Sequence, residues 1–131
     1  MNRLRLCLGT MITAAVLLLC AGAMAEIRIN EVMASNGVYQ DGHAYDWAEL
    51  YNDGAEVSLA GWYLSNDPYQ PYKWAFPSGA KIAENGYLIV YCAGEGKEPM
   101  TDALCTNFKL SADGDTLYLT SPDGESTVLS F

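Results

Sequence analysis

Apolar and polar residues alternate in three short aromatic segments, at 46–52, 61–65 and 73–77, which hold all three tryptophans of the chain. A period of two residues is typical of β-strands that turn one face to a core. In the third segment the pattern places Tyr72, Trp74 and Phe76 on one side of the pleat, and we expect that side to be buried.

Turn signals separate the strand-like segments. Asn-Gly, Asp-Gly and Ser-Gly pairs recur about every eight to twelve residues, the spacing of a sandwich or barrel. The segment 87–92 is apolar on both faces, as expected of a central strand covered on both sides. Segments 116–120 and 127–131 flank a Pro-Asp-Gly turn and predict a C-terminal hairpin. After the N-terminal segment no helical periodicity is sustained, so we expect an all-β sandwich with little or no helix.

The first 25 residues have the layout of a secretory signal peptide: basic residues, an apolar run over 11–20 and an Ala-Met-Ala site. We expect cleavage after Ala25 and a secreted single domain of residues 26–131. The apolar run is shorter than the ~20 residues of a spanning helix, so no stable membrane insertion is expected after cleavage. The chain stops inside an apolar segment, which indicates either a complete minimal domain or, as we favour, the front of a longer secreted protein.

The predicted secreted domain is strongly acidic. The whole chain has a formal net charge of −9, and removal of Arg3 and Arg5 with the signal peptide leaves five basic residues against sixteen acidic ones, or 5 − 16 = −11. Such a surface repels phosphate backbones, whose binding depends on Lys and Arg. Nucleic acid is therefore excluded as a partner, whereas cations and basic surfaces are attracted. The sequence does not indicate an oligomeric state.

Two cysteines, Cys92 and Cys105, remain in the predicted secreted domain. An even number in a secreted protein is consistent with one disulfide. The alternative is a pair of free thiols, and the sequence leaves both open.

Six sequence segments, in order, give the chain a family resemblance. They are Ile-Asn-Glu-Val-Met-Ala-Ser-Asn at 29–36, Asp-Trp-Ala-Glu-Leu-Tyr-Asn at 46–52, Leu-Ala-Gly-Trp-Tyr-Leu-Ser-Asn at 59–66, Lys-Trp-Ala-Phe-Pro at 73–77, Asn-Gly-Tyr-Leu at 85–88 and Thr-Asn-Phe-Lys-Leu-Ser at 106–111. The chain resembles the lamin tail domain, a module of nuclear lamins that also occurs in secreted bacterial proteins. The resemblance implies an immunoglobulin-like β-sandwich that is non-catalytic and accessory to other exported domains. It implies a role in binding or attachment.

Catalytic chemistry has two weak candidates. His43 is the only histidine, with Asp41 and Asp46 nearby, but no nucleophile motif accompanies it, so we interpret it as a loop residue exposed to solvent. Glu31 and Glu49 lie in strand-like segments, and Glu31 shares its pleat parity with Ile29 and Met33. Two carboxylates that face each other at a suitable separation are the catalytic pair of most glycoside hydrolases. A small extracellular hydrolase using these two is the alternative to a binding module, and a purely structural spacer is another.

Acidic loop residues raise the question of a metal. Asp41, Asp46 and Asp53 carry the oxygen ligands that Ca²⁺ prefers, although their spacing matches no EF-hand loop. A weak calcium site is therefore one hypothesis, with ordinary turn formation as the other. No other cofactor is expected.

Four residues are candidates for partner contact. Trp47, Glu49 and Tyr51 share one face of their strand, opposite Ala48 and Leu50. Tyr69 lies in a loop with two prolines, and rigid aromatic side chains suit protein or glycan contact. Trp62 and Trp74 are expected in the core. We predict a secreted binding or attachment module for an extracellular protein or a cell-wall glycan.

Overall fold

The computed structural model describes residues 25–97 and 100–131, and in them the chain forms ten strands and no helix. The predicted signal peptide, apart from Ala25, lies outside the described residues. Within them, no helix is long and apolar enough to cross a membrane. The strands are β1 (Ile27–Met33), β2 (Asp46–Asn52), β3 (Val57–Ser58), β4 (Tyr63–Ser65), β5 (Trp74–Ala75), β6 (Lys81–Ile82), β7 (Tyr87–Cys92), β8 (Leu104–Cys105), β9 (Thr116–Thr120) and β10 (Ser126–Ser130).

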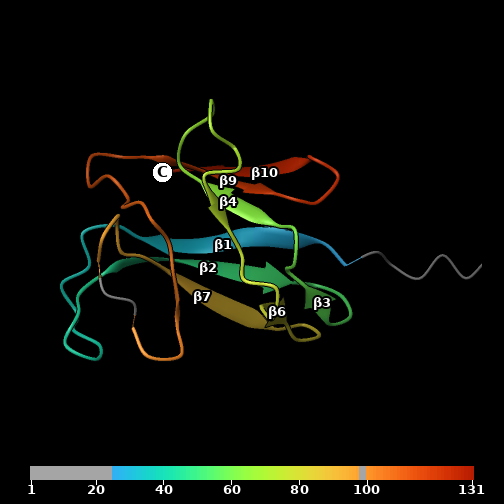
Figure 1. The fold of residues 1–131 in the computed structure, drawn as a ribbon, viewed down its shortest axis with the longest axis horizontal. Helices are drawn as coiled ribbons and strands as arrows, with labels where there is room; N and C mark the ends of the chain where they lie inside the picture. The colour runs from blue at the N-terminus through green and yellow to red at the C-terminus, as the bar shows by residue number, and fades with distance from the viewer. Residues whose placement is uncertain (1–24, 98–99) are drawn as a thin grey trace, which may run out of the picture.

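Two four-stranded sheets form the layers of a sandwich (Figure 1). The first sheet has the order β1-β2-β7-β8 and the second β10-β9-β4-β5, and a small third sheet pairs β3 with β6. All pairs are antiparallel except β7 with β8. The expected all-β, immunoglobulin-like sandwich is confirmed.

Alternating side chains from both sheets fill the core. Ala48 and Leu50 of β2, Val90 of β7 and Leu117 and Leu119 of β9 are fully buried. The C-terminal hairpin forms as predicted, with β9 against β10, and Gly124 in its turn takes the positive φ of 86° that favours glycine. The period-two pattern therefore located the core correctly in these strands.

The third aromatic segment is only partly buried. Phe76 is in the core. Trp74 and Trp62 are half-buried, and both pack against the core. Tyr72, expected on the same buried side, is instead 58% exposed and packs edge-on against Tyr63. A turn explains the difference: the amide of residue 73 donates to the carbonyl of Gln70, so the strand begins only at Trp74 and its alternation does not reach back to Tyr72.

Candidate functional site

The candidate site lies on the outer face of the first sheet, which we define as the face turned away from the second sheet. Along β2, Ala48 and Leu50 are buried whereas Trp47, Glu49 and Tyr51 are half-exposed. The predicted sharing of one face by these three residues is confirmed. The core does not need their side chains, so they are available for contact.

Strand register arranges the outer face in three rows that run across β1, β2 and β7. Each row takes one residue from each strand, and neighbouring rows are two residues apart along β2 and β7, or about 7 Å. The rows are Met33, Trp47 and Tyr91; Glu31, Glu49 and Ile89; and Arg28, Tyr51 and Tyr87.

A bulge in β1 brings Glu31 into its row. The register shifts between Ile29 and Glu31, because Ile29 pairs with Leu50 whereas Glu31 pairs with Glu49. The extra residue reverses the alternation, so Ile29 is buried and Glu31 is exposed. The expectation that Glu31 has the parity of Ile29 was therefore wrong, whereas its shared parity with Met33 is confirmed.

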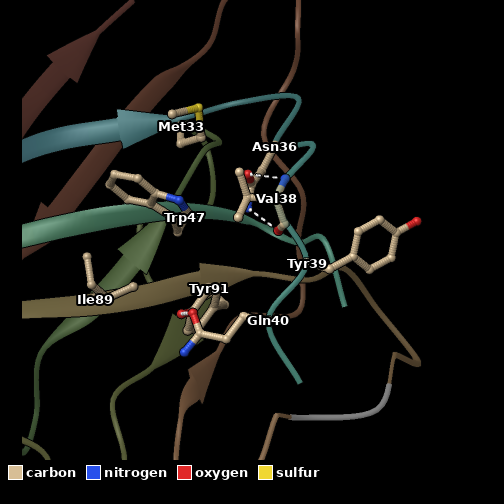
Figure 2. Close-up of a pocket in the computed structure, with 8 residues that line it drawn as sticks. All are labelled: Met33, Asn36, Val38, Tyr39, Gln40, Trp47, Ile89 and Tyr91. Atoms are coloured by element: carbon tan, nitrogen blue, oxygen red, sulfur yellow. Dashed lines mark hydrogen bonds between the residues drawn. The ribbon is translucent and has the colours of Figure 1, made fainter. Parts of the chain in front are cut away.

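A pocket of about 530 Å³ opens at the first row (Figure 2). Its walls come from β1, β2, β7 and the loop that joins β1 to β2, and every lining residue is uncharged. The indole of Trp47 lies between Met33 on one side and Ile89 and Tyr91 on the other. The lining residues are Met33, Asn36, Val38, Tyr39, Gln40, Trp47, Ile89 and Tyr91.

Hydrogen bonds hold the loop that closes one end of the pocket. The Asn36 amide nitrogen donates to the carbonyl of Tyr45 at 2.9 Å, and its side-chain oxygen accepts from the amide of Val38 at 2.9 Å. The backbone N–H of Asn36 donates to the carboxylate of Asp46 at 3.0 Å. Gln40 and His43 pair through their backbones at 2.8 and 2.9 Å. The end wall is thus fixed by local bonds rather than by core packing.

Polar groups sit at the same end of the pocket. The Tyr91 hydroxyl donates to the Gln40 side-chain oxygen at 2.5 Å. Partial burial, with the nearby Asp41 carboxylate and Cys105, raises the pKa of Tyr91 and so favours the protonated phenol that donates this bond. In the described part of the chain, the indole N–H of Trp47 and the amide nitrogen of Gln40 donate to no partner and stay open to solvent. A ligand with acceptor oxygens would satisfy both.

Of the eight residues that line the pocket, only Trp47 was predicted to take part in binding. Ile89 and Tyr91 belong to the segment thought to be covered on both sides, but its outward side chains are half-exposed or, at Tyr87, 61% exposed. The period-two pattern of that strand was the signal that could have identified them. Val38 and Gln40 lie in an irregular loop, which carries no such signal.

The two glutamates proposed for hydrolysis do come together. Glu31 and Glu49 are direct cross-strand partners on the outer face, and Glu49 accepts a hydrogen bond from the Asn30 amide at 2.8 Å. Neither of them lines the pocket. The two glutamates lie next to the pocket instead, because they share their row with Ile89, which lines it.

Tyr69 lies apart from the other three binding candidates. It is 92% exposed on the loop between β4 and β5, two strands of the second sheet, and this loop projects at the top of Figure 1. Asp67 shapes this loop by accepting from the Tyr69 backbone N–H at 2.9 Å and from the Gln70 amide at 3.0 Å. Tyr69 is exposed as expected, but it does not share a site with Trp47.

The three aspartates suggested for calcium do not converge. Asp46 and Asp53 stand at opposite ends of β2, about 23 Å apart at the rise of an extended strand. Asp46 accepts from the loop amide of Asn36, and Asp53 accepts from the backbone N–H of Glu26 at 2.8 Å. Among residues 25–97 and 100–131, no three His, Cys, Asp or Glu side chains gather as metal ligands. A site built from all three is therefore a wrong expectation.

Cys92 and Cys105 are free thiols. Cys105 pairs with Tyr91 in the parallel register of β7 and β8, so it points outward with Tyr91, whereas Cys92 points into the core. The disulfide alternative is thus not realised, because the two thiols face opposite sides of the sheet. Burial raises the pKa of Cys92 to about 12.

His43 has a packing role in the loop. Its ring stacks on Tyr45 with centroids 4.8 Å apart and an angle of 15° between the planes. The side chain is half-exposed rather than fully exposed. Nothing in this geometry presents it to a nucleophile.

A comparison with protein families gives one finding. The family model described as Lamin Tail Domain matches residues 21–130, which is most of the chain. This family consists of immunoglobulin-like modules without enzymatic activity. No curated protein matches the chain.

Proposed function

Because the chain belongs to the lamin tail domain family, we propose that it is a secreted, non-catalytic module that binds an extracellular protein or a cell-wall glycan through the outer face of its first sheet. One observation carries the proposal: the pocket of about 530 Å³ beside Trp47, on a face whose side chains the core does not use. Recognition sites are typically concave and mostly apolar, with a few placed polar groups.

The chemistry of the pocket supports binding rather than reaction. Its lining residues include no acid, histidine or cysteine, and of its two tyrosines Tyr91 donates its hydroxyl to Gln40. The indole of Trp47 offers an apolar face, and its N–H with the Gln40 amide offers donors. Aromatic side chains with one polar edge are enriched at binding interfaces for this reason.

The test is a binding screen of the purified chain against immobilised cell-wall glycans and extracellular proteins, with and without calcium. The proposal expects at least one ligand whose binding falls about tenfold or more in Trp47→Ala. Tyr69→Ala is the matched control, since it removes an exposed aromatic side chain from the second sheet. If no ligand binds, or if Trp47→Ala binds every ligand as well as the unmodified chain, the proposal is wrong and a spacer role is favoured.

A further inference from the structure

We propose that the occupant of the outer face is an extended, basic segment of a partner protein, with an apolar side chain in the pocket and a lysine or arginine over Glu31 and Glu49. This inference rests on the proposed function and names its partner. Glu31 and Glu49 face each other directly across β1 and β2, where like charges repel.

Among residues 25–97 and 100–131, no Lys or Arg forms an ion pair with Glu31 or Glu49. In the described part of the chain the ion pair that forms is between Lys81 and Glu56, and Glu49 has only the neutral Asn30 amide as its partner. Arg28 lies in the next row, where its guanidinium stacks on the ring of Tyr51 at 4.7 Å. The carboxylates are accordingly open to a cation from outside.

The position of Glu31 and Glu49 relative to the pocket determines the spacing of the apolar and basic residues in the partner segment. Glu49 follows Trp47 by two residues on the same face, so the acidic row lies about 7 Å from the row that holds the pocket. An extended peptide along the strands repeats its side chains on one face at the same interval. An apolar residue in the pocket therefore brings the side chain two positions away over the carboxylates.

The negative charge of the face favours a protein segment with a basic residue over Glu31 and Glu49. The pocket lining is uncharged and the chain has sixteen acidic residues against seven basic ones, so an anionic ligand is repelled and a cationic one is attracted. A neutral glycan could donate hydroxyl hydrogen bonds to the carboxylates, but it carries no positive charge to compensate the pair. The third row, with Arg28 exposed, disfavours a second basic residue at the next position of the same face.

The experiment measures binding of fluorescent seven-residue peptides to the purified chain at low salt. One peptide has a leucine and, two positions on, a lysine; a second replaces the lysine by glutamate; a third moves the lysine by one position. We expect the first to bind at least about fivefold more tightly than the other two. Equal binding of all three would overturn the inference.

Isosteric variants locate the effect. Glu31→Gln with Glu49→Gln should abolish the preference for lysine while binding of a lysine-free apolar peptide stays the same. The matched control is Glu84→Gln with Glu125→Gln, which removes the same charge from exposed residues outside the three rows. If both double variants lower the preference equally, only the net charge matters and the inference is wrong.

Other occupants give distinct results. A neutral glycan that needs Trp47 but ignores the two glutamates would overturn this inference and leave the proposed function standing. Self-association lost in Trp47→Ala, measured by sedimentation, would make a second copy the occupant and also overturn it. Lack of any ligand that depends on Trp47 would remove the proposed function itself.

Discussion

Asn52 at the end of β2 is expected to be one of the most sensitive polar positions for stability. Its side chain is fully buried and ties together two turns. The amide nitrogen donates to the carbonyls of Ala55 at 2.8 Å and Ala83 at 3.1 Å, and the amide oxygen accepts from the backbone N–H of Gly54 at 3.1 Å. Asn52→Ala removes these three bonds; the Ala55 carbonyl and the Gly54 N–H lose their partner, whereas the Ala83 carbonyl still accepts from the backbone N–H of Gly86.

The expected loss follows from these bonds. Each contributes about 1 kcal/mol net, so the variant should lose about 3 kcal/mol from a domain stability of about 5–15 kcal/mol. For a domain of this size the melting temperature would fall by about 12–24 °C. Denaturant and thermal unfolding monitored by tryptophan fluorescence measure both quantities.

Asn30→Ala provides the control. Asn30 is exposed on the neighbouring strand and makes one bond, to Glu49, so its loss should cost less than about 1 kcal/mol. If the unfolding free energy of Asn52→Ala lies within about 1 kcal/mol of that of the unmodified chain, these bonds do not stabilise the domain as expected. Equal costs for the two substitutions would lead to the same conclusion.

Three further predictions concern the thiols and tryptophans. Burial raises the pKa of Cys92 to about 12, against 9.0 in the unfolded chain. The unfolded chain therefore loses this proton first, and the free energy of unfolding falls above pH 9, by about 1.4 kcal/mol at pH 10. Cys92→Ala should show a shallower alkaline decline in urea titrations, and identical slopes would contradict this prediction. In the folded domain a thiol reagent should modify Cys105 rapidly and Cys92 only on unfolding, and mass spectrometry of the labelled peptides distinguishes the two. Trp74→Ala should cost about 2–3 kcal/mol of unfolding free energy and Trp47→Ala about 1 kcal/mol, since Trp74 packs against the core and Trp47 lies on the outer face. A reversed order in urea unfolding would contradict this prediction.

Strand alternation and turn residues were enough to predict much of the fold. In β2 the alternation separated Trp47 and Glu49 from the buried Ala48 and Leu50 correctly. The same rule failed for Glu31, because the bulge in β1 inserts one residue, and a bulge without a glycine leaves no mark in an apolar pattern. It also failed at Tyr72, where a turn precedes the strand.

The site was less accessible to sequence reasoning than the fold. Trp47 was identified, but the end wall of the pocket comes from the loop over 34–45, whose shape depends on the hydrogen bonds of Asn36. These bonds join residues at different separations along the chain, so no sequence pattern predicts them. The thiols show the same limit, because the parallel pairing of β8 with β7 decides that Cys105 faces away from Cys92.

The central claim is that ligands bind at Trp47 on the outer face. The most direct test is a two-dimensional ¹H–¹⁵N NMR titration of the labelled chain with the leucine–lysine peptide or the best ligand of the screen, observing the three indole N–H signals. We expect the Trp47 signal to shift with ligand concentration, whereas the signals of Trp62 and Trp74, which pack against the core, stay in place. Saturable binding that moves Trp62 or Trp74 and leaves Trp47 unchanged would contradict it.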